Sequence, residues 1–260
     1  MRTAPLMLIL ALGLAACTDQ TPANSTTSTV TTTPAIYQAR VDQGPNGEPI
    51  TIPAIRPAYL SERNMRQRVA YNGPEAPGSI VVDPYSRFLY HVMPNGEAMR
   101  YSVAVGRAGK GFAGEATIQR KAAWPSWTPT ANMVRTEPEL YGHLAGGVKG
   151  GADNPLGSRA LYLYQGSADT MYRIHGTMDP SSIGKATSAG CIRLFNQDVM
   201  DLFNEVPRGT YVKVRSAAES RMYEGELVET PDGYMVSPAE YQAQQAALAE
   251  RQAAAAARKR

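Results

Sequence analysis

The sequence predicts a mainly β fold, a β-sandwich or barrel-like domain that contains one or two short helices. Three observations support this prediction. Short runs of alternating or β-branched residues recur between positions 79 and 214, and turn residues such as Gly, Pro and Asn separate them. Helical periodicity in this region is confined to one stretch near its end. Many short strands with few helices are typical of antiparallel sandwiches and barrels.

Each predicted strand is a short run bounded by turn residues. Pro94-Asn95-Gly96-Glu97 is a hairpin signal that joins two of these strands. The predicted strands cover residues 79–83, 88–92, 99–105, 116–120, 161–164, 172–175 and 211–214.

The clearest predicted helix covers residues 196–205. Val199, Leu202 and Phe203 recur there at helical spacing, and Pro207 ends the pattern. One face of this helix is therefore expected to pack on the sheet.

Two further helices are candidates outside this region. Ser237-Pro238-Ala239-Glu240 has the form of a capping box, and the Ala- and Gln-rich residues 241–257 follow it. This helix lacks a wide apolar stripe, so we expect it to be solvated. A short helix is also a candidate at residues 62–69.

Composition divides the chain into five parts. Residues 1–16 have the layout of an export signal, and residues 17–34 are a polar stretch rich in Thr and Ser that is expected to be a disordered, flexible tether. Residues 35–77 are rich in proline and are expected to form an extended arm on the edge of the domain. Residues 78–215 are expected to form the folded domain, and residues 216–260 a tail that contains the polar helix.

Cys17 follows Leu14-Ala15-Ala16, a pattern that resembles a bacterial lipobox. In a lipoprotein this cysteine is diacylated and becomes the mature N-terminus, and two or three acyl chains anchor a protein firmly. Thr18 after the cysteine favours the outer membrane over the inner one. The alternative is a cleaved signal peptide and free secretion.

Charge and cysteine content exclude several classes of protein. A net charge of +3, without a basic stripe interleaved with aromatic residues, gives no indication of nucleic-acid binding. Two cysteines, one of them at the predicted lipidation position, exclude a disulfide framework. No cluster of Cys, His and Asp has the spacing of metal ligands, so we expect no metal site.

Cys191 is the candidate nucleophile, and His175 lies sixteen residues before it. A thiol becomes reactive near neutral pH when a base takes its proton, and histidine has a suitable pKa for this role. Gly190 lets the backbone approach a substrate closely, and amides at such a turn can stabilise an oxyanion. The alternative is a buried cysteine that only packs. The spacing alone leaves both alternatives open.

His175 ends a predicted strand just before Gly176, a position that suits a catalytic side chain on a rigid scaffold. The other two histidines, His91 and His143, are weaker candidates. His91 lies in an alternating strand and is expected at a surface or core position. His143 lies in a glycine-flanked loop and is a candidate for lining a substrate cleft.

The run from His175-Gly176-Thr177 to Ser188-Ala189-Gly190-Cys191-Ile192-Arg193-Leu194 resembles the signature of the L,D-transpeptidases, which have the YkuD-type catalytic domain. The likeness extends over about residues 78–214. The resemblance implies an enzyme that cuts a peptidoglycan tetrapeptide stem after its meso-diaminopimelate, releases D-alanine and transfers the acyl group to an amine. It implies no metal or organic cofactor.

By this resemblance Cys191 is the nucleophile and His175 the base, with the backbone carbonyl of Gly176 orienting the imidazole. The amides of Gly190 and Cys191 are expected to form the oxyanion site. Arg193 is expected to steady the site or to meet a stem carboxylate, with an ion pair inside the fold as the alternative.

The remaining substrate-binding candidates lie around this centre. Ser188 matches the Ser or Thr that opens the family motif and is expected to hydrogen-bond near the thiol. Trp127 and His143 are candidates for the substrate wall. Ala189 departs from the histidine that is common in the family, and the loop at residues 110–115 departs from its usual Thr-Pro-x-Gly stretch.

The expected partners are therefore peptidoglycan stem peptides, and the expected location is the periplasm, lipid-anchored through Cys17. The acyl acceptor stays open between the amine of a second stem, the amine of an envelope protein, and water, which would make the protein a carboxypeptidase. The competing class is a non-catalytic lipoprotein that tethers the membrane to peptidoglycan.

Overall fold

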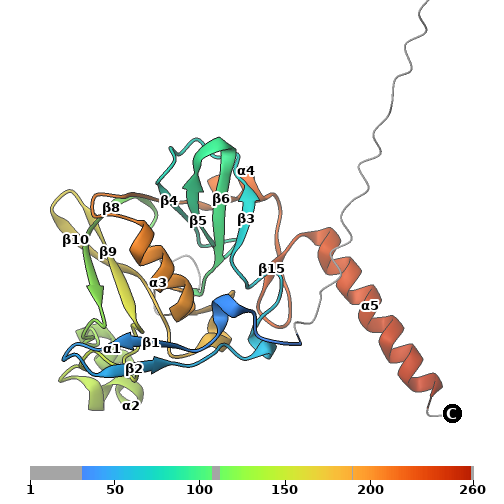
Figure 1. Cartoon of the computed structure of the whole chain (residues 1–260). Coiled ribbons are helices and arrows are strands. Elements are labelled where there is room, and N and C mark those ends of the chain that lie inside the picture. The colour runs from blue at the N-terminus through green and yellow to red at the C-terminus, as the bar shows by residue number, and fades with distance from the viewer. Residues whose placement is uncertain (1–30, 107–111, 189, 259–260) are drawn as a thin grey trace, which may run out of the picture.

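A nine-stranded mixed sheet forms the centre of the computed structural model, which describes residues 31–106, 112–188 and 190–258 (Figure 1). In spatial order its strands are β12 (Ile192–Arg193), β10 (Ala168–His175), β9 (Arg159–Gln165), β8 (Gly114–Ala123), β13 (Tyr211–Val214), β4 (Ile80–Asp83), β5 (Phe88–Met93), β6 (Glu97–Ser102) and β3 (Gln67–Ala70). Neighbouring strands are antiparallel, except that β10 pairs with β12 and β13 with β4 in parallel. The predicted mainly β class is confirmed.

The main core lies between this sheet and α3 (Asn196–Glu205). It draws buried side chains from every strand of the sheet except β3. Each fully buried aliphatic side chain contributes roughly 1.5–3 kcal/mol by its removal from water. The fully buried members of this core include Ile80, Leu89, Ile118, Leu161, Leu163, Ile174, Val199 and Leu202.

Helix α3 covers the residues that the apolar spacing predicts. Val199 and Leu202 are fully buried, whereas Asn204 is exposed, so one face of the helix points into the core. The N–H of Val206 donates to the carbonyl of Leu202, and Pro207 follows without an N–H to continue the helix. The predicted helix at 196–205 is confirmed.

The arm that precedes the main sheet contains two short 3-10 turns, η1 (Ala35–Tyr37) and η2 (Pro57–Tyr59), and a hairpin of β1 (Arg40–Gln43) and β2 (Pro49–Ile52). It ends in β3, which pairs with β6 at the edge of the main sheet. The helix expected at residues 62–69 is therefore wrong, because residues 67–69 are extended by pairing with a distant strand.

Two short helices, α1 (Ala131–Thr136) and α2 (Pro138–Tyr141), and the turn η5 (Gly142–Leu144) connect β8 to β9. The sequence patterns did not predict them. Smaller pieces complete the domain: the turns η3 (Pro94–Gly96) and η6 (Pro180–Ser182), and β7 (Val105–Gly106), which pairs in parallel with β11 (Ala186–Ser188).

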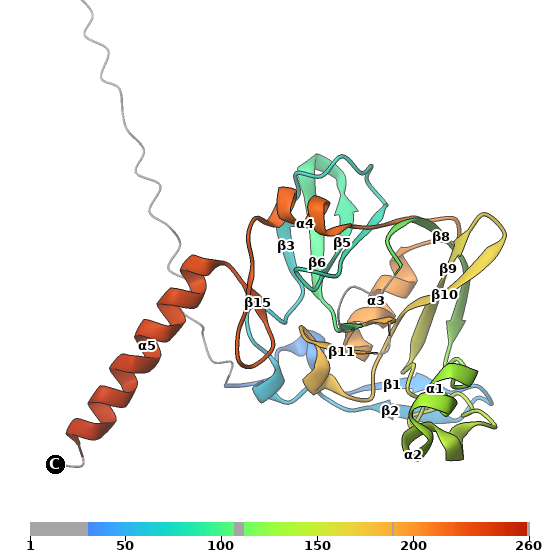
Figure 2. The ribbon, with the colours of Figure 1, turned by 180° about the vertical axis from the view of Figure 1, so that it is seen from behind.

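The C-terminal tail holds α4 (Ala217–Glu224), β14 (Val228–Glu229), β15 (Met235–Val236) and α5 (Pro238–Ala257). Helix α5 extends away from the body of the molecule and buries none of its residues (Figure 2). Ser237 accepts from the N–H of Glu240, which is half of the predicted capping box. Of the helices that the structure describes, none combines the length and the apolar character needed to cross a bilayer.

Several predictions fall outside the described residues. These are the export signal at residues 1–16, the lipidation position Cys17, most of the tether at 17–34, and Ala189.

Candidate functional site

His175 ends β10 and Cys191 directly precedes β12, and these two strands pair in parallel. In this register Ile174 lies opposite Ile192, and His175 lies opposite Arg193. The two isoleucines point into the core. Because side chains alternate between the faces of a strand, His175 and Arg193 lie on the other face.

His175 is almost completely buried, with 3% of its surface exposed. Its Nδ1 atom lies 2.6 Å from the carbonyl oxygen of Gly176, as the family resemblance predicted. A carbonyl oxygen only accepts, so Nδ1 carries the proton and the neutral ring presents Nε2 as an acceptor. Burial and the nearby charge of Arg193 lower the pKa of His175 to about 3, although backbone hydrogen bonds to Gly176 and Leu156 oppose this shift.

Cys191 is partly exposed just before β12. Burial raises the pKa of its thiol, while a backbone hydrogen bond from Arg173 and the charges of Arg173 and Arg193 oppose that rise. Together with the lowered pKa of His175, this makes a neutral thiol and a neutral imidazole the resting forms of the two groups at neutral pH.

Gly190 adopts a backbone conformation that side chains rarely tolerate, with φ of 140°. A Cβ atom there would meet nothing closer than Cε1 of Tyr172, at 3.6 Å. The backbone conformation, rather than lack of space, therefore requires glycine before the thiol. A small cavity of about 40 Å³ lies beside it, lined by residues that include Phe112 and Ile192.

The predicted substrate residues are distributed around this centre. Tyr141 at the end of α2 lies within electrostatic range of Arg193, whose pKa is lowered by burial, and the ring of Trp127 lies 6.1 Å from that of Tyr141. His143 is exposed on the adjoining turn η5. Ser188 ends β11, where its backbone lies opposite Gly106. Trp127 therefore contacts Tyr141, and Tyr141 in turn acts on Arg193.

The sequence interpretation missed a row of charged and aromatic side chains near the thiol. Arg120 on β8 pairs with Tyr162 on β9, which pairs with Arg173 on β10. Both guanidinium groups stack on the ring of Tyr162, at 4.4 and 4.3 Å from its centroid. Arg173 lies two residues before His175 in an alternating strand, and this spacing was the available signal that the two side chains share a face.

A bulge in β10 fixes Arg173. The register with β9 shifts between Asp169 and Arg173, and Met171 inside the bulge has φ of 64°. This turn brings Asp169 to Arg173 on the same strand, where its two oxygens accept from the guanidinium at 2.7 and 2.8 Å. The cation beside the thiol is therefore held in one orientation.

A larger cavity lies elsewhere in the molecule. It measures about 470 Å³ and contains none of the predicted site residues. Its lining includes Glu75, Glu115, Lys213, Arg215 and Glu219. Within residues 31–106, 112–188 and 190–258, no three Cys, His, Asp or Glu side chains group closely enough to hold a metal ion.

Comparison with known proteins identifies the family of this chain. The model of the L,D-transpeptidase catalytic domain, YkuD, matches residues 77–214. The probable L,D-transpeptidase ErfK/SrfK of Escherichia coli is 36% identical over 138 residues, which are 52% of this chain and 43% of that protein. A putative L,D-transpeptidase of Fuscovulum blasticum is 41% identical over 101 residues, which are 39% of this chain and 49% of that protein. The chain thus spans less than half the length of these relatives.

Among solved structures, a crystal structure from Brucella melitensis is 50% identical and covers 56% of this chain and 90% of that one, with a TM-score of 0.41. It is described as a probable carnitine operon oxidoreductase CaiA. The match to the family model covers more than half of the sequence and includes His175, Gly190 and Cys191. The chain belongs to the L,D-transpeptidase family, with its YkuD catalytic domain at residues 77–214.

Proposed function

We propose that the protein is a peptidoglycan L,D-transpeptidase in which Cys191 is the nucleophile and His175 the general base. The observation that carries this proposal is the parallel register of β10 and β12, which brings the strand end at His175 beside the strand that begins just after Cys191. Family membership indicates the class of reaction. The strand register supports the proposal that the Cys191 thiol and the His175 imidazole act together in that reaction.

In the first half of the reaction, the Cys191 sulfur attacks the carbonyl carbon of the amide that joins meso-diaminopimelate to D-alanine. Nε2 of His175 takes the thiol proton as the carbon–sulfur bond forms. The amides of Gly190 and Cys191 are proposed to stabilise the oxyanion. The carbon–nitrogen bond then breaks, the imidazolium returns the proton to the leaving amine, and D-alanine departs from a thioester.

In the second half, an acceptor amine attacks the thioester. His175 takes a proton from this amine, a new amide bond forms, and the thiol leaves with the proton restored. The neutral forms of the two groups suit this sequence, because the proton passes between groups whose resting forms are both uncharged. We propose the side-chain amine of a second stem peptide as the acceptor, which makes the product a cross-link.

The charges around the thiol support an anionic substrate. Arg173 and Arg193 both lie within electrostatic range of Cys191. Stem peptides carry carboxylates, which guanidinium groups bind in paired hydrogen bonds. We propose that Arg193 meets a stem carboxylate and that Trp127, His143 and Ser188 contribute to the substrate-binding wall.

We further propose that the enzyme works in the periplasm, anchored through lipid on Cys17. The supporting feature is the lipobox-like sequence before Cys17. Cells that express the full chain and are labelled with an acyl-chain precursor should transfer label to the wild-type protein and not to Cys17→Ser. Label on neither protein would leave a cleaved, secreted form.

The catalytic proposal is tested with purified protein and disaccharide tetrapeptide, with products separated and weighed by mass spectrometry. Wild-type enzyme should release D-alanine and form a dimer linked between two diaminopimelates. Cys191→Ser should do neither, whereas Asn204→Ala, an exposed change on α3, should leave both unchanged. D-alanine release with only tripeptide as product would show that water is the acceptor. Binding without any release would replace the enzyme by the tether alternative.

A further inference from the structure

The side chain of Asn196, the first residue of α3, lies between the two backbone segments that flank His175. Its Oδ1 atom accepts from the N–H of Ser158 at 2.9 Å, and its Nδ2 atom donates to the carbonyl of Thr177 at 2.9 Å. The two bonds fix the amide orientation, because an N–H donates and a carbonyl accepts. One amide therefore ties the end of the loop before β9 to the loop after β10.

The same two segments hold the imidazole. The carbonyl of Gly176, next to Thr177, accepts from Nδ1 of His175. The backbone of Leu156, two residues before Ser158, also acts on the ring and opposes the fall in its pKa. A shift of either segment would therefore change the tautomer or the direction of the ring.

Two glycines leave room for this amide. A Cβ atom at Gly157 or at Gly176 would overlap Oδ1 of Asn196. Gly157 in addition has φ of 63°, a region that favours glycine. The close approach of both segments to Asn196 is thus built into the backbone, and a different side chain at 196 would not reproduce the paired bonds.

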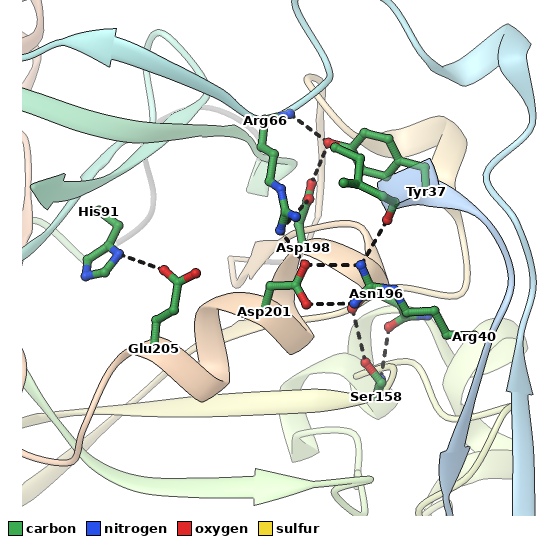
Figure 3. Close-up of polar contacts among 10 residues, drawn as sticks. Tyr37, Arg40, Arg66, His91, Ser158, Asn196, Asp198, Asp201 and Glu205 are labelled. Carbon is green, nitrogen blue, oxygen red and sulfur yellow. Dashed lines mark hydrogen bonds and ion pairs between the residues drawn. The ribbon is translucent and has the colours of Figure 1, made fainter. Parts of the chain in front are cut away.

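The arm, which lies outside the matched domain, anchors the helix that carries Asn196. Tyr37 is fully buried, donates to Asp198 at 3.3 Å and accepts from the N–H of Arg66 at 2.7 Å. Arg40 and Arg66 donate to Asp201 at 2.7 and 2.5 Å. Figure 3 shows these side chains gathered around the start of α3, with Asn196 in contact with Ser158.

We propose that Asn196 is a positioning residue for His175 and that the arm, through Tyr37, Arg40 and Arg66, holds α3 so that this amide stays between the two segments. The proposal rests on the role of His175 as the base. It makes the arm part of the catalytic unit, although the arm precedes the matched residues 77–214.

The test uses the full chain with Asn196→Ala and, as the matched control on the same helix, Asn204→Ala. The first readout is the ¹⁵N spectrum of the histidines, of which the chain has three. Asn196→Ala should move the His175 ring signals away from a single Nδ1–H tautomer, and Asn204→Ala should not. This readout requires no turnover, so it stays informative if the proposed reaction is wrong.

The second readout is steady-state kinetics. Asn196→Ala should lower kcat on the order of 10²-fold with little change in KM, because a small misplacement of a reacting group has that effect. Asn196→Asp keeps the acceptor for Ser158 and should recover part of the loss. Arg66→Met, which leaves Asn196 intact, should change the His175 signals in the same direction and by less.

Unchanged His175 signals and unchanged kcat in Asn196→Ala would overturn the proposal. So would a loss of activity that merely follows the fraction of unfolded protein. If Asn196→Ala does not fold, Asn196→Asp and Arg66→Met carry the test, and wild-type signals and kcat in both would overturn it.

Discussion

The site at β10 and β12 and the larger cavity around β13 use titratable groups in opposite ways. In the cavity, hydrogen bonds from Lys213 and Ser216 lower the pKa of Glu219 to about 2, and the same contact raises the pKa of Lys213. At the site, burial raises the pKa of Cys191 and lowers that of His175. The cavity thus favours charged forms that pair and stabilise the fold, whereas the site favours the neutral forms that the proposed proton exchange needs. The two regions therefore differ in the chemistry of their titratable groups as well as in cavity volume.

The strongest test of this difference removes the base. His175→Asn should lower turnover by about 10³-fold, the range of a general acid–base contribution. His91→Asn is the matched control, because His91 lies on β5 with Nδ1 3.2 Å from Glu205 and should leave turnover unchanged. Equal, small effects of both changes, measured as D-alanine release, would remove His175 from the mechanism.

The next test concerns the cation beside the thiol. Arg173→Met should raise the pKa of Cys191 further, so that alkylation of the thiol by iodoacetamide becomes several-fold slower at pH 8 and its midpoint moves to higher pH. Arg120→Met, on the other face of the Tyr162 ring, should have a much smaller effect. In the wild type the midpoint itself should lie above that of an ordinary thiol. A midpoint below neutral pH would mean that the resting state is an ion pair.

Asp198 is a buried titratable group outside the site, so its ionisation is expected to affect stability. Burial raises the pKa of Asp198 to about 7, outside the site. When a carboxyl group binds its proton more tightly in the folded state, the folded protein loses stability as pH rises from the unfolded pKa of that group toward its folded pKa. For Asp198 this range is about 4 to 7. Asp198→Asn should remove this loss, on the order of a few kcal/mol.

The measurement is the difference in free energy of unfolding between Asp198→Asn and wild type, from urea titrations at each pH. The variant should gain on the wild type between pH 4 and 7. A difference that is constant with pH would show that Asp198 is ionised throughout.

The smallest effect is expected in the cavity. Lys213→Met removes a partly exposed ion pair of 2.7 Å with Glu219, and such pairs contribute about 0–1 kcal/mol. Unfolding by urea should detect at most this change, and turnover should equal that of the wild type. A large loss of turnover would show that the cavity also takes part in function and is not only a stabilising region.

The sequence predicted the local features of this structure well. The helix at 196–205 and the strand at 211–214 have the bounds that their apolar spacing indicates, because each buries one face against neighbours near in sequence or in the sheet. The segment at 62–69 was misread as a helix because its edge pairing with β6 is a non-local effect that no local pattern reports.

The site was predictable where a motif carries it, and not elsewhere. The hydrogen bond from His175 to Gly176 agrees with the resemblance. Asn196 contacts segments that are distant in sequence, and Asp169 reaches Arg173 only because β10 contains a bulge. Spacing along the chain therefore did not predict the role of either residue. Arg173 could have been found, because strand alternation puts it on the face of His175.

The most direct test of the central claim is the mass of the intact protein during turnover of disaccharide tetrapeptide, after rapid acid quenching. A covalent adduct with the mass of the substrate less D-alanine, mapped to Cys191 and absent from Cys191→Ala, is the predicted result. D-alanine release by Cys191→Ala at the wild-type rate, without any adduct on the wild-type thiol, would contradict the account.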